Sequence, residues 1–218
     1  MLGVYNYTVW MTYVAMIISF VGISYVLDGN FKAALLCLMA SGVLDMFDGK
    51  VASTKKDRTD FQKGFGIQID SMSDLICYGV LPAMIVYELG REGSRLKFGP
   101  LPPVHNIVTA ICACYLLCAL IRLAFFNVDE AERQKVTAEE RHIYKGLPVT
   151  SIALIIPAIY DICSVVRRPF SEYVGAGILI VCGIAFISPF KIVKPNLLGK
   201  IVLICVGIAE IVALIVCC

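Results

Sequence analysis

The chain has 218 residues, of which 59% are hydrophobic and 17% charged, and its mean hydropathy is +0.81. A soluble domain of this size cannot bury so much apolar surface, so the composition excludes a soluble globular protein and indicates an integral membrane protein. The formal net charge of +2 says little about partners, and we expect none among nucleic acids.

Seven apolar stretches are of roughly spanning length, since about 20 helical residues cross the hydrocarbon core of a bilayer. In chain order they cover about residues 8–27, 31–52, 66–89, 104–126, 147–166, 173–190 and 197–216. The sixth is short and ends at Ser188-Pro189, which predicts a kink or a partly re-entrant course. The expected fold is an all-α polytopic helix bundle forming one integral-membrane domain over residues 1–218.

The basic residues of the loops set the expected orientation. Segments 55–63, 133–145 and 191–200 hold most of the loop lysines and arginines, and the alternate loops hold fewer. Because basic residues favour the cytoplasmic side, we expect the N-terminus and these three segments in the cytoplasm. The prediction is an integral protein of the cell membrane whose functional end faces the cytoplasm.

Four aspartates lie in or beside the second and third apolar stretches. Asp45 and Asp48 are three residues apart, and Asp70 and Asp74 are four apart, so each pair projects from one face of its helix. Acids inside a membrane are found paired, protonated or bound to metal, and no run of lysine or arginine is close enough in sequence to pair four of them. Two opposed faces of this kind would form a nest of oxygen ligands, which suits Mg²⁺ or Mn²⁺ rather than Zn²⁺.

Small residues accompany the aspartates. Gly49 and Ala52 follow Asp48 by one and four residues, on or next to the same helix face, and Gly66 precedes Asp70 by one turn. They leave room for a bulky anionic ligand to approach the backbone. Close helix packing is the alternative explanation for the glycines, because it is common in membranes, and for Gly49 and Gly66 the two explanations are compatible.

This constellation resembles the motif of the CDP-alcohol phosphatidyltransferase family, D-x2-D-G-x2-A-R followed by a spacer and G-x3-D-x3-D. The matching residues are Asp45, Asp48, Gly49, Ala52, Gly66, Asp70 and Asp74. Two departures stand out: Ser53 replaces the arginine of the motif, and segment 54–65 is about four residues longer than the usual spacer. Segments 70–83, 122–127 and 145–148 are similar to the phosphatidylserine synthase branch of the family.

The resemblance implies a six-helix core over about residues 8–190, one added C-terminal helix over about 197–216, and a homodimer. It also implies two divalent cations, Mg²⁺ or Mn²⁺, with Asp45, Asp48 and Asp70 as ligands. Asp74 would contact the second cation and take the proton from the acceptor alcohol as general base. The implied reaction transfers a phosphatidyl group from CDP-diacylglycerol to L-serine and releases CMP.

The resemblance likewise implies where the two substrates bind. Gly49, Ala52 and Gly66 would line the pocket for the CDP group. Because Ser53 lacks the charge of the family arginine, we expect a basic residue of the longer loop to supply it; the candidates beside Ser53 are Lys55, Lys56 and Arg58.

The carboxylate of serine needs a cationic partner. We expect Arg122 to bind it, with Asn127 and Lys145 as secondary contacts. For Arg122 alone, the alternative is a side chain that extends along the helix to the cytoplasmic interface.

Two alternatives to this function remain open at the level of sequence. The same chemistry could use another alcohol, such as glycerol phosphate, inositol or inositol phosphate, or an archaeal lipid donor. A divalent-cation transporter is the alternative from a different class, because intramembrane aspartates also mark ion pathways. The Asp-Gly-x-x-Ala spacing argues against transport, which does not require it.

Overall fold

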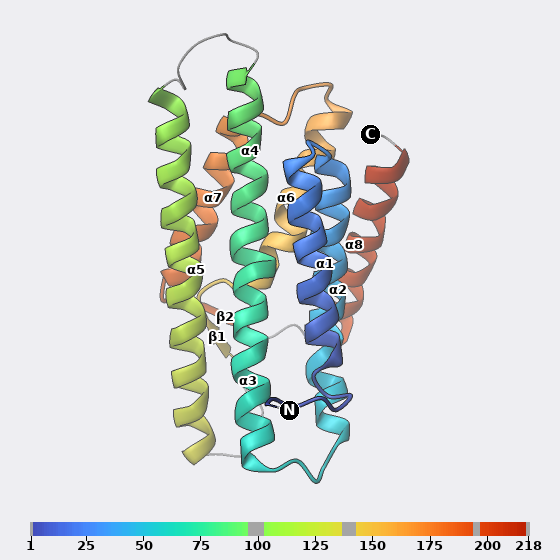
Figure 1. Ribbon diagram of the computed structural model, residues 1–218, viewed down its shortest axis with the longest axis vertical. Coiled ribbons are helices and arrows are strands. Elements are labelled where there is room, and N and C mark those ends of the chain that lie inside the picture. Colours follow the sequence, from blue (N-terminus) through green and yellow to red (C-terminus); the bar gives the residue numbers. More distant parts are fainter. Residues whose placement is uncertain (1, 96–102, 137–142, 194–196, 217–218) are drawn as a thin grey trace.

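The structure is a computed structural model that describes residues 2–95, 103–136, 143–193 and 197–216. Within these residues the chain makes seven helical passes that run along the long axis of one bundle (Figure 1). The elements are α1 Trp10–Leu27, α2 Phe31–Thr54, α3 Asp60–Asp74, the π-helical turn η1 Leu75–Val80, α4 Leu81–Arg95, α5 Pro103–Val136, β1 Ile143–Lys145, the 3₁₀ turn η2 Val149–Ser151, α6 Ile152–Val165, α7 Glu172–Ile187, β2 Lys191–Val193 and α8 Leu197–Val216.

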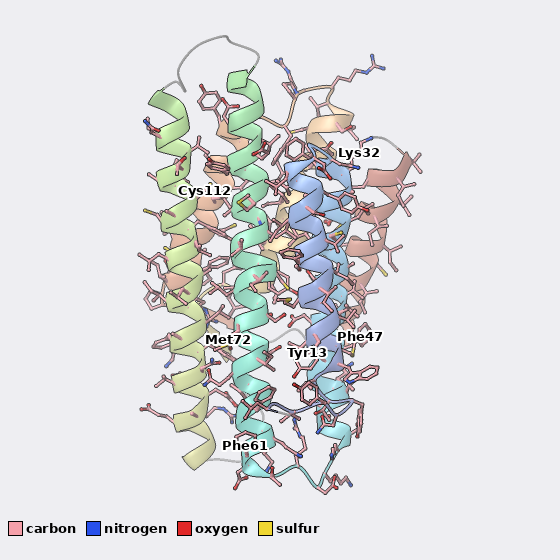
Figure 2. All side chains as sticks on the ribbon, viewed as in Figure 1. Tyr13, Lys32, Phe47, Phe61, Met72 and Cys112 are labelled. Atoms are coloured by element: carbon pink, nitrogen blue, oxygen red, sulfur yellow. The ribbon has the colours of Figure 1, made fainter. Side chains whose placement is uncertain are left out.

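The predicted all-α membrane bundle is confirmed, because each of the seven apolar stretches forms a helical pass. Three described helices are long and apolar enough to cross a membrane: Trp10–Leu27, Asp60–Gly90 and Asn106–Arg133. Val149–Val165, Glu172–Ile187 and Val202–Val216 are shorter apolar helices. Apolar side chains also cover the outside of the bundle (Figure 2), and Phe47, Phe61 and Met72 are 39%, 73% and 61% exposed. Along the apolar helices, such a surface suits contact with the hydrocarbon of a bilayer rather than with water.

The sixth stretch differs from the prediction. Helix α7 has no proline within it and ends at Ile187, so Ser188-Pro189 follows the helix rather than kinking it, and the re-entrant course stays a prediction. After the proline, β2 pairs antiparallel with β1, and Tyr144 lies opposite Ile192. This short two-stranded sheet is the only one among the described residues, and it is an addition to the all-α fold that the apolar pattern did not indicate.

Local signals position the two helices that carry the aspartates. Asn30 caps α2, because its side chain accepts a hydrogen bond from the Ala33 amide. Thr59 and Gln62 form a capping box at the start of α3, so only residues 55–59 separate the two helices. The connection turns the chain back at one end of the bundle, which is also where the C-terminal end of α5 lies (Figure 1).

Helix α1 lies close against α2 because its inner face is made of small residues. A Cβ atom on Gly22 would lie 2.9 Å from Cβ of Cys37 on α2 and 3.1 Å from Leu81 at the start of α4. Small residues at such interfaces let helix backbones approach in membranes. The buried residues of α1 are Thr12, Ala15, Ser19, Gly22 and Val26.

The second half of the chain packs on the other side of the third pass. The Tyr115 hydroxyl on α5 donates to the Tyr78 carbonyl in η1, and the Tyr115 ring lies 5.6 Å from that of Phe186 on α7. A Cβ atom on Gly175 of α7 would lie 2.8 Å from the Val86 side chain on α4. The third pass therefore stands between α1 and α2 on one side and α5 and α7 on the other, and it carries Asp70 and Asp74 near the C-terminal end of α3.

Candidate metal centre

The structure brings the predicted metal ligands together. Asp45 on α2 and Asp70 and Asp74 on α3 each offer a carboxylate oxygen, and these three oxygens lie within 4.8 Å of one another. Asp48, one turn further along α2, lies within hydrogen-bonding reach of Asp70. The short connection makes α2 and α3 antiparallel, and both helices contact α1, which brings aspartates from two sequence positions to one place.

The cluster contains more negative charge than its surroundings neutralise. The ion pairs between Lys63 and Asp60, Arg133 and Glu130, and Lys145 and Asp129 do not involve the four aspartates. Oδ1 of Asp70 is buried without a hydrogen-bond partner. An unsatisfied carboxylate oxygen beside three other carboxylates fits a hard divalent cation, which takes oxygen ligands. The residues present therefore fit the Mg²⁺ or Mn²⁺ that the sequence predicts.

Gly49 and Gly66 border open space. A Cβ atom at either position would meet no described atom within 4 Å, in contrast to the clash it would meet at Gly22. Close helix packing therefore does not require glycine at these two positions, and the packing explanation offered by the sequence is not supported. Space next to the aspartates remains for a ligand, as the alternative explanation requires.

The residues predicted to replace the charge of the family arginine differ in their surroundings. Ser53 is exposed and donates its hydroxyl proton to the Lys50 carbonyl of its own helix at 2.7 Å. Lys56 is also exposed, whereas Lys55 and Arg58 are half-buried. Nε of Arg58 is buried and has no hydrogen-bond partner among the described atoms. Of the three cations, Arg58 is thus the one with an unsatisfied donor enclosed by protein.

Arg122, predicted to bind the acceptor, is enclosed by protein. Its side chain is only 6% exposed, and its guanidinium lies 5.3 Å from the centre of the Phe126 ring. A side chain that extended along the helix to reach interfacial water would be exposed, so the alternative explanation for Arg122 is not supported.

Asn127 projects from one side of α5, and Lys145 contacts residues on the opposite side. The Asn127 amide donates to the Ser71 hydroxyl on α3 at 2.8 Å. Lys145 pairs with Asp129 at 2.9 Å and lies 5.6 Å from the Phe125 ring. Residues 125 and 129 lie two positions before and after Asn127, which places them nearly opposite it because each residue turns the helix by about 100°. The three predicted acceptor residues therefore do not gather on one face of α5.

The sequence analysis did not identify three residues with side-chain hydroxyl groups that lie near the aspartates. Thr12 on α1 donates to Oδ2 of Asp48 at 3.3 Å, and the hydroxyl of Ser73 donates to the Thr12 carbonyl at 3.3 Å. Ser71 bonds to Asn127. The sequence does show small polar residues within these helices. It does not show which residues they hydrogen-bond to.

The chain matches the sequence profile of CDP-alcohol phosphatidyltransferase over residues 5–187. It belongs to this family. The match extends well beyond segment 45–148, on which the resemblance rested, and includes helices α1 to α7. In family terms, the first half of the motif occupies the C-terminal half of α2 and the second half occupies α3.

Among the relatives, an archaetidylserine synthase of Methanothermobacter thermautotrophicus is 29% identical over 79% of this chain and 63% of its own length. A CDP-diacylglycerol–serine O-phosphatidyltransferase of Helicobacter pylori is 26% identical over 80% of this chain and 68% of its own length. An enzyme of the latter name from Saccharomyces cerevisiae is 31% identical, but over 53% of this chain and 37% of its own. The chain thus spans about two thirds of the first two relatives. No solved structure shows a significant match.

Proposed function

We propose that the protein is a CDP-diacylglycerol–serine O-phosphatidyltransferase, which makes phosphatidylserine and CMP at the cytoplasmic face of the cell membrane. The observation that carries this proposal is the convergence of three motif aspartates, Asp45, Asp70 and Asp74, in a structure that leaves open space at Gly49 and Gly66. The names of the archaeal, bacterial and yeast relatives share serine, whereas they differ in the lipid. The homodimer implied by the resemblance is part of the proposal.

The proposed reaction is a single displacement at the phosphorus of the phosphatidyl group. The serine hydroxyl oxygen forms a bond to this phosphorus, the bond from phosphorus to the oxygen of CMP breaks with its electron pair on CMP, and the hydroxyl proton passes to Asp74. Asp45, Asp48 and Asp70 would hold two divalent cations, with Asp74 in contact with the second. When bound, these cations supply charge neutralisation for the pyrophosphate and the leaving CMP.

CMP release from purified protein in detergent tests the function. The protein is incubated with CDP-diacylglycerol, Mn²⁺ or Mg²⁺, and one alcohol at a time: L-serine, glycerol phosphate, inositol or inositol phosphate. We expect CMP and phosphatidylserine when the alcohol is L-serine, and no CMP with the other three alcohols. CMP release with a different alcohol would show that this alcohol, not serine, is the acceptor. CMP release only with an archaeal lipid donor would show that CDP-diacylglycerol is not the donor. A protein that released no CMP but carried Mn²⁺ into liposomes would be the transporter instead.

Arg58 is expected to bind the phosphates or nucleotide of the donor. Removal of a charge-assisted contact costs roughly 1.5–3 kcal/mol, so Arg58→Ala should raise KM for CDP-diacylglycerol about tenfold or more in CMP-release kinetics. Exposed Lys56 provides the matched control, and Lys56→Ala should have a smaller effect. Unchanged KM after alanine substitution at Lys55, Lys56 and Arg58 together would show that the pocket works without this charge.

Arg122 is expected to bind the carboxylate of serine. Its planar guanidinium can form two parallel hydrogen bonds with a carboxylate, whereas a lysine keeps the charge and loses that geometry. Arg122→Lys should therefore raise KM for serine far more than KM for CDP-diacylglycerol, as measured by varying each substrate separately. If both constants rise together, or only that of the donor rises, Arg122 contacts phosphate or stabilises the helix, and serine binds elsewhere.

A further inference from the structure

Thr12 bonds to both of the helices that carry the aspartates. Its hydroxyl donates to Oδ2 of Asp48 on α2, and its carbonyl oxygen accepts from the hydroxyl of Ser73 on α3, each at 3.3 Å. Thr12 and Ser73 are 6% and 5% exposed, so little water competes for either bond. Helix α1 supplies none of the motif aspartates, yet one of its residues connects the two helices that do.

The hydroxyl of Thr12 has a specific use at this position. A threonine hydroxyl carries one proton, and an ionised carboxylate can only accept, so the bond must run from Thr12 to Asp48. Asp48 is also within hydrogen-bonding reach of Asp70. The hydrogen bond that Thr12 donates to its carboxylate comes from α1, so the orientation of the carboxylate depends on where α1 places the Thr12 hydroxyl.

The packing of α1 sets that position. Gly22 lets α1 approach α2 so closely that a Cβ atom at this residue would lie 2.9 Å from Cβ of Cys37. A second contact one turn beyond Thr12 joins α1 to the third pass, because the thiol of Cys77 lies 3.6 Å from the Ala15 carbonyl. Thr12 is thus presented to Asp48 by a helix that contacts both α2 and the third pass.

We propose that Thr12 is a positioning residue for the metal centre. By holding Oδ2 of Asp48, it fixes the orientation of the other carboxylate oxygen, so that a divalent cation meets a ligand already in place. Hydrogen-bond partners of metal ligands act in this way in other proteins, and their loss typically costs about 10–100-fold in metal affinity or activity. This inference rests on the proposed function, because it assumes that Asp48 is a ligand.

Binding of Mn²⁺ alone to the full chain in detergent tests the inference, with unbound Mn²⁺ measured by electron paramagnetic resonance. Thr12→Val keeps the shape of the side chain and removes only the donor, so Mn²⁺ binding should weaken about 10–100-fold. Thr12→Ser keeps the hydroxyl and should bind like the wild type. Ser24→Ala is the matched control on α1, because the Ser24 hydroxyl bonds only to the Val21 carbonyl of its own helix at 2.8 Å.

Two further readouts separate positioning from general stability. At saturating Mn²⁺, Thr12→Val should recover most of its turnover with an unchanged KM for serine, and its metal-free unfolding temperature should match that of Thr12→Ser. Thr12→Ala removes the same donor with a better helix former and provides a second variant if the valine variant folds poorly.

Wild-type Mn²⁺ affinity in Thr12→Val and Thr12→Ala would overturn the inference. Asp48→Asn, measured in parallel, then shows where the error lies. If Asp48→Asn loses Mn²⁺ affinity while the Thr12 variants keep it, the metal centre stands and Thr12 has no part in it. If Asp48→Asn also binds Mn²⁺ normally, the assignment of Asp48 as a ligand is wrong as well.

Discussion

Chelation with EDTA is expected to abolish CMP release completely, and excess Mn²⁺ or Mg²⁺ is expected to restore it. The physical reason is the repulsion within the aspartate cluster. Two unit charges 4.8 Å apart, the limit for the oxygens of Asp45, Asp70 and Asp74, repel each other by roughly 3 kcal/mol at an effective dielectric constant of about 20. Without cations, the cluster can lower this repulsion only by taking up protons, and protonated aspartates neither bind a pyrophosphate-neutralising cation nor accept the serine proton.

Substitutions show whether the restored activity belongs to this cluster. Asp45→Asn, Asp48→Asn and Asp70→Asn should each remove nearly all turnover at any Mn²⁺ concentration while leaving a folded protein in detergent. Asp60→Asn is the matched control, since Asp60 lies on the same helix as Asp70, is fully exposed and pairs with Lys63 at 3.5 Å. Full activity in chelator, or a loss with Asp60→Asn equal to that with Asp70→Asn, would contradict a metal centre at these aspartates.

The sequence predicts the aspartate helices well because their features are local. Asp45 with Asp48 and Asp70 with Asp74 have spacings that place each pair on one helix face whatever the rest of the fold does. Helix limits were less predictable, because hydropathy reports only the part of a helix that lies in hydrocarbon. Helix α3 begins at Asp60 rather than near residue 66, and its start is marked by the Thr59 and Gln62 capping box instead of by apolar residues.

The extension of α5 has a similar cause. The helix continues to Val136, ten positions past the apolar stretch that ends at 126. Its polar end contains Glu130 and Arg133, which form a bidentate pair with N–O distances of 3.0 and 2.6 Å. Such a pair one turn apart stabilises a helix outside the hydrocarbon region. A search for apolar stretches does not detect this polar part of the helix.

Contacts between distant segments could not be predicted from one sequence. The β1–β2 pairing depends on Gly146, whose φ is +76° and whose Cβ would lie 2.7 Å from the Phe186 carbonyl oxygen. Only glycine fits a left-handed backbone so close to another chain segment. Likewise, the partners of Thr12 and Asn127 follow from how the helices are rotated about their axes, which one sequence alone does not determine.

Asp74→Asn is expected to lower kcat by at least about 10²–10⁴-fold, the usual contribution of a positioned general base. An amide has the size of the carboxyl group but cannot take up the proton of the serine hydroxyl. The position suits the role, because Asp74 is the last residue of α3 before the π-helical turn Leu75–Val80 and carries an oxygen within 4.8 Å of those of Asp45 and Asp70.

Because Asp74 is also a proposed metal ligand, kcat alone does not identify the base. Mn²⁺ binding and the pH dependence of kcat should be measured on the same Asp74→Asn protein. If Mn²⁺ remains bound and kcat still falls by the expected factor, the loss belongs to proton transfer, since the remaining aspartates hold the cation and the donor is still activated. If Mn²⁺ binding is lost in proportion to kcat, Asp74 acts as a ligand, and the serine proton must pass to another group. A near-wild-type rate would remove Asp74 from both roles and leave Asp45 and Asp70 as the remaining carboxylates of that group.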